Sequence, residues 1–261
     1  MLGTTCLFLI TTSKDTMERP LTLELAVLCS YVLQKPIMIL SEDISRSLQR
    51  VNHIIESWNV SLVESYIKVN DKISYWIENG GDTNSDMCKH IRRDKYPLIL
   101  FKNINSAKDI TISRQMMITI RDDLNLTING EIGLDMINLD DIRDKISNIT
   151  LTIEVRAYIY DIIVELRYSR FVKGGLPTYI LFNLIEFIKF WAFINDRTYI
   201  TPRIVKTCCQ IILPECLNLT LVEEDPTLMY GSEIKLINQL NKIINNEDIV
   251  EIALLKVKPP I

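Results

Sequence analysis

The fold of this chain is decided by Val155–Leu217, which contains the fragments Val155-Arg-Ala-Tyr-Ile159, Gly174-Gly175-Leu-Pro177 and Asp196-Arg-Thr-Tyr199-Ile-Thr-Pro202. Apolar residues recur here at helical spacing, which predicts three helices: Ile153–Arg170, Thr178–Ile194 and Pro202–Leu213. The third helix has a strong start signal, because Thr201 suits the N-cap and Pro202 suits the first turn. We therefore expect this stretch to form a compact helical bundle that packs on the rest of the chain.

The 261-residue chain has the composition of an ordinary globular protein. It is 48% hydrophobic and 24% charged, with only 9 prolines and 8 glycines, so it can bury one or two cores. Its net charge of -4 gives no overall electrostatic footprint for nucleic acid, and we predict no direct nucleic-acid binding. The longest apolar stretch, Tyr179–Ile194, is interrupted by Glu186 and Lys189 and is shorter than a membrane span. We expect an intracellular protein of the nucleus or cytoplasm without membrane contact.

The cysteines do not form a recognisable metal site. No pair has CxxC spacing and the only histidines are His53 and His90, whereas a zinc site needs about four soft ligands at typical spacings. We predict reduced, mostly buried thiols and no metal or other cofactor. The six residues are Cys6, Cys29, Cys88, Cys208, Cys209 and Cys216.

The first half alternates strand-like and helix-like segments. Short apolar runs predict three strands: Thr5–Ile10, Pro36–Leu40 and Tyr96–Phe101. Helical spacing predicts three helices: Leu21–Leu33 opened by Pro20, one that begins at the N-cap Ser41, and Ile112–Arg121. Ser61–Ile77 fits either a strand or a helix, and Asn79–Asp86 is interpreted as a loop. This alternation predicts an α/β fold with a three-layer parallel sheet.

The alternation of strand-like and helix-like segments ends at Asn125–Ser147, where scattered acids and the glycines Gly130 and Gly133 indicate a domain boundary. We assign residues 1–125 to an α/β domain, 126–147 to a connecting segment, 148–218 to a helical lid and 219–261 to a C-terminal tail. The tail is predicted to contain a helix near Glu233–Ile244 and a β-prone strand over Ile249–Ile261. Because it is too apolar for a free linker, it either folds back on the chain's own core or docks on a partner subunit.

The opening fragments resemble the C-terminal lid of MoxR/RavA-type AAA+ ATPases and their magnesium-chelatase relatives. That lid consists of a helix, a Gly-Ala-Ser-Pro-Arg turn, a second helix, a Gly-Arg-x-Tyr-Val-Thr-Pro segment and a third helix. The likeness covers Val155–Leu217, where both the spacing and the turn residues agree. It implies that a P-loop NTPase-like sheet half precedes the lid.

The chain as a whole is similar to the fungal maintenance of telomere capping protein 2 family. Tyr96-Pro-Leu-Ile-Leu-Phe-Lys-Asn-Ile-Asn105 and Ile118–Asp122 resemble that family's central strand and following helix. Leu228-Met-Tyr230-Gly231-Ser232 and Lys256-Val-Lys-Pro259-Pro260-Ile261 resemble its tail. The resemblance implies an ATPase-like fold with a part in telomere capping and no assigned biochemical activity.

Three positions depart from what ATP hydrolysis needs. Phosphate binding needs a glycine-rich loop, but Thr11-Thr-Ser-Lys14-Asp-Thr16 has no glycine and places an acid beside Lys14. Magnesium binding and water activation need acids after a central strand, where this chain has Lys102-Asn103. The turn proline of the lid is followed by Thr178, where an arginine should face the phosphates. We therefore assign no catalytic, cofactor-binding or metal-binding residue.

Other candidate groups are weaker. Arg167 and Arg197 could meet the acids of a partner, although contacts within the scaffold are favoured. The pairs Asp122-Asp123 and Asp140-Asp141 are interpreted as exposed acids at helix starts, since no histidine accompanies them. A Cys–His pair assembled only in space stays open.

Two hypotheses remain at this stage. The preferred one is a non-catalytic scaffold or interaction protein on a degenerate AAA+-like fold, with protein partners that the sequence does not identify. The alternative is an atypical nucleotide-binding ATPase, or a non-hydrolysing subunit of a hetero-oligomeric AAA+ assembly. The sequence does not predict the oligomeric state.

Overall fold

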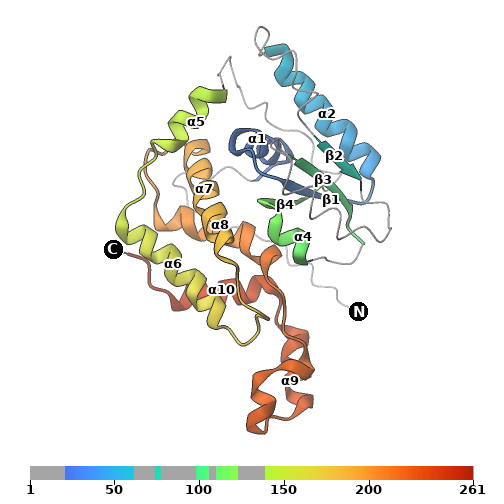
Figure 1. Ribbon diagram of the computed structural model, residues 1–261, viewed down its shortest axis with the longest axis vertical. Coiled ribbons are helices and arrows are strands. Elements are labelled where there is room, and N and C mark those ends of the chain that lie inside the picture. Colours follow the sequence, from blue (N-terminus) through green and yellow to red (C-terminus); the bar gives the residue numbers. More distant parts are fainter. Residues whose placement is uncertain (1–20, 62–73, 78–97, 106–109, 123–138, 261) are drawn as a thin grey trace, which may run out of the picture.

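The structure, a computed structural model, describes residues 21–61, 74–77, 98–105, 110–122 and 139–260. A small sheet with its covering helices forms one half, and a group of helices forms the other (Figure 1). The predicted strand Thr5–Ile10, the predicted loop Asn79–Asp86 and the phosphate-loop position Thr11–Thr16 lie outside the described residues. Among the described residues, no helix combines the length and the apolar character needed to cross a membrane.

The described sheet has four parallel strands in the order β2-β3-β1-β4. The strands are β1 (Ile37–Ser41), β2 (Ser74–Ile77), β3 (Leu98–Asn103) and β4 (Ile118–Arg121). The alternation of strands and helices thus predicted the α/β class and the parallel pairing correctly. The ambiguous segment Ser61–Ile77 ends in a strand, and the Tyr96–Phe101 strand runs two residues further along the chain than expected.

Both faces of the sheet are covered by helices. Ile37 and Ile39 of β1 belong to the main core together with α1 (Leu23–Leu33) and α2 (Ile44–Ser61). Met38 of β1 packs instead with Leu100 of β3 and with α4 (Ile110–Gln115). Successive strand residues point to opposite faces, so this division follows from the strand period of two. Helix α1 begins at Leu23 rather than near Pro20, because the Thr22 hydroxyl accepts a 3.3 Å hydrogen bond from the Leu25 N–H.

The prediction of a helix over Ile112–Arg121 is wrong in its second half. Helix α4 ends at Gln115, and the chain continues as β4. The Met117 N–H donates to the Pro36 carbonyl at 2.6 Å, and Ile118 then pairs with Ile37 of β1. Strand preference depends mainly on the partner strand. The apolar spacing of this segment alone does not reveal that β1 lies beside it.

The helical half contains α5 (Leu139–Ser147), α6 (Ile153–Tyr168), α7 (Thr178–Ile194) and α8 (Pro202–Cys216). The N-cap prediction for α8 is confirmed, since the Thr201 hydroxyl accepts a hydrogen bond from the Ile204 N–H at 3.4 Å. Helix α7 is predominantly apolar, and three of its aromatic residues, Phe187, Phe190 and Trp191, are fully buried. The three helices predicted for Val155–Leu217 are therefore present and share one core with the sheet half.

Side chains of three basic residues join the halves. Arg114 of α4 donates to the Gly175 carbonyl at 2.8 Å and to the Cys216 carbonyl at 3.1 Å. Arg143 of α5 donates to the Tyr31 and Val32 carbonyls at the end of α1. Lys35, just before β1, forms an ion pair with Glu186 of α7 at 3.4 Å. The lid is thus fixed on the sheet half by directed bonds as well as by apolar packing.

The C-terminal segment contains two helices with different surroundings. We call the segment from η2 (Val222–Glu224) through η3 (Pro226–Tyr230) and α9 (Ile234–Ile243) the protruding lobe, since it extends from the end of the molecule (Figure 1). Helix α10 (Asn246–Lys256) instead packs on α6 and α8. The predicted strand over Ile249–Ile261 is wrong: the Asn245 N–H donates to the Asp248 carboxylate at 2.9 Å, a start signal that outweighs the β-prone residues.

Candidate functional site

The carboxyl edge of the sheet is where α/β folds usually bind ligands, and the connection from β1 to α2 lies there. Between this inner strand and the helix stand only Glu42 and Asp43. The Asp43 carboxylate accepts from the Arg46 N–H at 3.2 Å, so Asp43 caps α2. The prediction of Ser41 as N-cap is wrong, because Ser41 is the last residue of β1. Its hydroxyl accepts from the Asp43 N–H at 3.2 Å and so shapes the turn before the helix.

A buried polar cluster, formed by Ser41, Ser47, Arg50 and Asp122, fills the space behind this turn. The Ser47 hydroxyl donates to the Asp122 carboxylate at 2.6 Å and lies 2.6 Å from the Ser41 hydroxyl. The Arg50 guanidinium forms an ion pair with the same carboxylate. The Asp122 N–H donates to the Leu40 carbonyl at 2.8 Å, which fixes the backbone at the end of β4. The charges of Arg50 and Asp122 thus neutralise each other where the sheet meets α2.

The connection between β1 and α2 is too short for a phosphate loop. Such a loop places glycine N–H groups around the anion between a strand and a helix, and it needs several residues to do so. Here the connection has two residues, both acidic, and no glycine. The glycines of the described chain lie elsewhere, at Gly174, Gly175 and Gly231.

Lys102 and Asn103 lie where the sequence placed them, at the end of β3 beside β1. The Asn103 carboxamide accepts from the Asn105 N–H at 2.8 Å, so it shapes the turn that follows the strand. Lys102 is only 4% exposed, and its side chain lines a cavity. A buried cation therefore lies at the carboxyl end of β3.

Arg167 serves the turn before α7. Its guanidinium donates to the Leu176 carbonyl at 2.9 Å and to the Thr178 hydroxyl at 3.4 Å. Gly174 and Gly175 have φ angles of +69° and +63°, which residues with a side chain rarely adopt. These contacts support the scaffold interpretation of Arg167. For Arg197, the structure gives a backbone hydrogen bond from its N–H to the Ala192 carbonyl at 2.9 Å.

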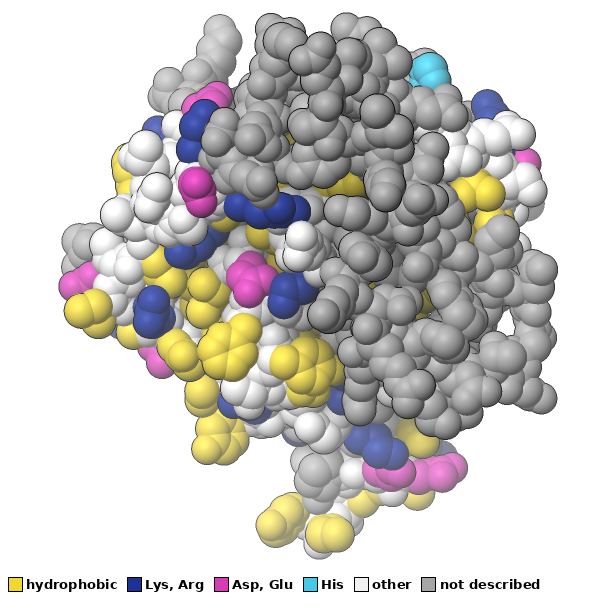
Figure 2. Space-filling model, turned by 45° about the horizontal axis from the view of Figure 1, so that its top comes forward, with side chains coloured by type: hydrophobic (Ala, Val, Ile, Leu, Met, Phe, Trp, Pro, Cys, Tyr) yellow, Lys and Arg dark blue, Asp and Glu magenta, His cyan; other side chains and the backbone are white. Residues whose placement is uncertain are grey.

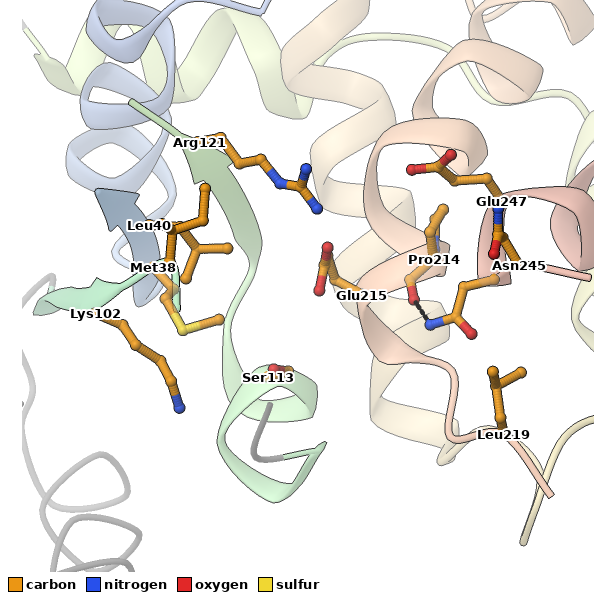
Figure 3. A pocket seen from close by; sticks show the side chains of 12 residues that line it. Met38, Leu40, Lys102, Ser113, Arg121, Pro214, Glu215, Leu219, Asn245 and Glu247 are labelled. Carbon is orange, nitrogen blue, oxygen red and sulfur yellow. Dashed lines mark hydrogen bonds between the residues drawn. The ribbon is translucent and has the colours of Figure 1, made fainter. Parts of the chain in front are cut away.

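A cavity of about 490 Å³ separates the sheet edge from α8 and the start of α10. Figure 3 shows Lys102 and Arg121 on the sheet side, with Glu215 and Glu247 on the helical side and Ser113 of α4 below. Met38, Leu40 and Leu219 add apolar surface. Sequence reasoning treated Lys102 only as a lost acid and did not identify this cavity, since α10 was expected to be a strand.

The acidic pairs behave differently from the prediction. Asp122 is buried rather than exposed, and it follows a strand instead of starting a helix. Asp140 and Asp141 lie in the first turn of α5, in agreement with the interpretation as helix-start acids. Sequence reasoning therefore missed the cluster around Asp122. Its only signal was an acid directly after the apolar run Ile118–Ile120, which was taken for a helix.

The described cysteines are buried thiols outside any disulfide, as predicted: Cys29, Cys208, Cys209 and Cys216. Burial raises the pKa of the Cys209 thiol to about 12. Burial, together with the nearby Glu186 carboxylate, raises the pKa of Cys29 well above its usual value. The thiolate is the reactive form, so these thiols are poor nucleophiles at neutral pH. Among the residues that the structure describes, no three acidic, histidine or cysteine side chains gather into a metal-binding group.

The comparisons with known proteins find partial relatives and a shared fold. No protein-family model matches the chain. A protein of Kluyveromyces lactis named "Maintenance of telomere capping protein 2" is 37% identical over 93 residues, which is 33% of this chain and 33% of that protein. A Lachancea thermotolerans protein of the same name is 30% identical over 109 residues, covering 39% of this chain and 38% of the relative. The matches thus span little more than a third of these curated relatives.

The crystal structure of a proposed ATPase from Cytophaga hutchinsonii superimposes with a TM-score of 0.57 and covers 85% of this chain and 88% of that one. Its sequence identity is 13%, so the likeness shows the fold alone. The predicted resemblances are thus confirmed in their coarse form. The chain is similar in part to fungal proteins named for telomere capping maintenance, and it shares its fold with a proposed ATPase.

Proposed function

We propose that this protein is a non-catalytic scaffold on a degenerate AAA+ ATPase-like fold, and that it contributes to telomere capping or maintenance in the nucleus or cytoplasm. The telomere part of the proposal is supported by the names of the two fungal relatives. The degenerate ATPase part is supported by the likeness to the Cytophaga protein and by the altered sheet edge.

One observation carries the loss of catalysis: the polar groups at the β1–α2 connection bind one another. Ser47 and Arg50 both bind Asp122, and the two-residue connection offers no glycine backbone to a phosphate. A ligand phosphate would have to displace an internal ion pair and overcome the charge of Glu42 and Asp43. Repulsion between like charges makes that binding unfavourable.

The protruding lobe supports a role in protein binding. Met229 is 90% exposed and Tyr230 is 89% exposed, and Ile234 and Leu236 of the same lobe are exposed as well, as is Leu221 just before it. Hydrophobic side chains are seen at the extended lower end of the molecule (Figure 2). Exposed apolar groups that gather on one projection mark an interaction surface more often than isolated ones do. We infer that a protein partner contacts the molecule at this lobe.

A second candidate function is nucleotide binding without hydrolysis. The cavity beside Lys102 and Arg121 favours it, since two cations at the carboxyl ends of β3 and β4, the strands on either side of β1, suit an anionic ligand. Such a chain could act as a nucleotide-binding subunit of a hetero-oligomeric AAA+ assembly. It would bind the nucleotide away from the β1–α2 connection.

Equilibrium dialysis of the full chain against ATP, with and without Mg²⁺, separates the two candidates. The scaffold proposal expects no retained nucleotide and no magnesium-dependent phosphate release in a coupled assay. Retention that Lys102→Met abolishes, and that Lys235→Met in the protruding lobe leaves unchanged, would favour the second candidate. Magnesium-dependent turnover that Lys14→Met reduces would contradict both, because it would restore a phosphate loop at Thr11–Thr16.

A further inference from the structure

The sheet wall of the cavity has a regular arrangement of charge. Leu40 of β1 lies in register with Lys102 of β3 on one side and with Arg121 of β4 on the other. All three side chains line the cavity, so two cations flank one apolar residue. Adjacent strands are about 4.8 Å apart, which puts the two cationic residues about 10 Å apart at their Cα atoms. The row lies at the carboxyl ends of the strands, where ligands of parallel sheets bind.

The helical wall opposite consists of hydrogen-bond acceptors. Glu215 of α8 and Glu247 of α10 both line the cavity, and Figure 3 shows their carboxylates on the side facing the sheet. Asn246 lies between the two helices, and its amide nitrogen donates to the Pro214 carbonyl at 2.7 Å. The Asn246 Oδ1 is buried and has no hydrogen-bond partner in the described part of the chain. The two carboxylates thus give this wall a negative charge opposite the Lys102 and Arg121 cations.

We propose that this cavity binds a small zwitterion, an amino acid with an apolar side chain or a molecule of the same chemistry. The carboxylate of the ligand lies toward Lys102 and Arg121, and its ammonium group lies toward Glu215 and Glu247. The apolar side chain contacts Met38, Leu40 and Leu219. Four charged groups of balanced sign favour a ligand that carries both signs over a polyanion such as a nucleotide. The volume of about 490 Å³ is within the usual range for small-molecule sites.

Matched probes test this proposal directly. L-leucine, L-leucinamide and 4-methylpentanoate have the same apolar group, but the second lacks the carboxylate and the third lacks the amine. In calorimetric titrations of the full chain, leucine, methionine or phenylalanine is expected to bind. The amide and the amine-free acid of the binding amino acid should each bind about tenfold more weakly or worse, because each loses one charge-assisted contact.

Two variants identify the cavity as the site. Arg121 is on an exposed strand end, so Arg121→Met should fold normally and weaken binding of the amino acid about tenfold. Glu247→Gln should weaken the binding of the amino acid but not the binding of the amine-free acid. Lys256→Met, which removes an exposed ion pair with Glu165 outside the cavity, is the matched control and should leave affinity unchanged.

The proposal is independent of the scaffold role, because it concerns neither hydrolysis nor a protein partner. It is overturned if none of the three amino acids binds at millimolar concentration. It is also overturned if ATP binds and Arg121→Met abolishes that binding, since the cavity would then be a nucleotide site.

Discussion

Asp122 binds α2 to the sheet edge through a single carboxylate. It accepts from Ser47 and Arg50, while its N–H binds the Leu40 carbonyl. We predict that Asp122→Ala lowers the free energy of unfolding by about 2 kcal/mol or more, because it removes the buried carboxylate that accepts from the Ser47 hydroxyl and pairs with the Arg50 guanidinium. Urea denaturation would measure this.

The control for this change is Asp161→Ala, which removes an exposed carboxylate of α6 and should cost well under 1 kcal/mol. Asp122→Asn keeps an acceptor for Ser47, so its loss of unfolding free energy should lie between those of Asp122→Ala and Asp161→Ala. Equal stability of Asp122→Ala and Asp161→Ala would mean that the polar cluster does not bind α2 to the sheet.

Asp225 caps the start of η3 in the protruding lobe, and we expect the stability of this start to depend on pH. Its carboxylate accepts from the Thr227 hydroxyl at 2.6 Å and from the Thr227 N–H at 2.9 Å, and the hydroxyl contact is the main cause of its lowered pKa. A lowered folded-state pKa stabilises the fold above the unfolded value near 3.8, and this contribution is lost as the pH falls through the folded value. We expect Asp225→Ala to cost about 1 kcal/mol at neutral pH.

Thermal melts at several pH values would check this prediction. The difference between the parent chain and Asp225→Ala should be constant near neutral pH and should shrink below about pH 4. Asp225→Asn, which can still accept a hydrogen bond, should lose less at neutral pH. A difference that persists unchanged into strong acid would show that the carboxylate charge is not involved.

At the scale of the element, two neighbouring substitutions in α6 test which face of this helix is buried in the lid. Ile163 is 1% exposed in the shared core, whereas its neighbour Val164 is 41% exposed. Ile163→Asp should cost several kcal/mol, because it buries a charge without a partner. Val164→Asp introduces the same group one position along and should cost about 1 kcal/mol or less. Equal melting temperatures for the two variants would show that the buried face of α6 is assigned wrongly.

Elements with their own end signals could be predicted from the sequence, and elements defined by a partner could not. Thr201-Pro202 marks the start of α8 locally, and that prediction is confirmed. Strand β4 depends on pairing with β1, in which Ile118 lies opposite the distant Ile37, so the apolar spacing of β4 alone predicts a helix. In α10, the β-prone Ile249 and Val250 concealed a helix whose start lies at Asn245.

The same distinction applies to the candidate site. The lysine and asparagine at the end of β3 are visible in the sequence, because a single strand carries Lys102 and Asn103. The cluster of Ser41, Ser47, Arg50 and Asp122 comes from β1, α2 and the end of β4, so its members meet only after the sheet forms. The cavity likewise needs α10 to lie against α8 before its two walls face each other.

At the scale of the whole molecule, the two halves form a single packed unit with one projecting part. The core cluster includes residues of the sheet, the lid and α10. In addition, Arg114 donates to the Gly175 carbonyl before α7 and to the Cys216 carbonyl at the end of α8. The alternative of a tail that folds back is therefore supported for α10, where Ile249, Val250 and Leu254 are buried. Docking on a partner remains the proposal for the protruding lobe.

Hydrogen exchange on the isolated chain would test this division of the tail. Amides of α10 should exchange slowly, because their helix opens only when the packing on α6 and α8 is lost. Amides of α9 should exchange much faster, because Ile237 is the only buried residue among the side chains of α9 that the structure describes. The double variant Met229→Ser/Tyr230→Ser should leave both exchange rates unchanged in the isolated chain. It should, however, weaken the binding of any partner that protects the lobe from exchange. Rapid exchange of α10 would mean that it does not complete the core, and removal of residues 226–261 would then leave stability unaffected rather than lowered.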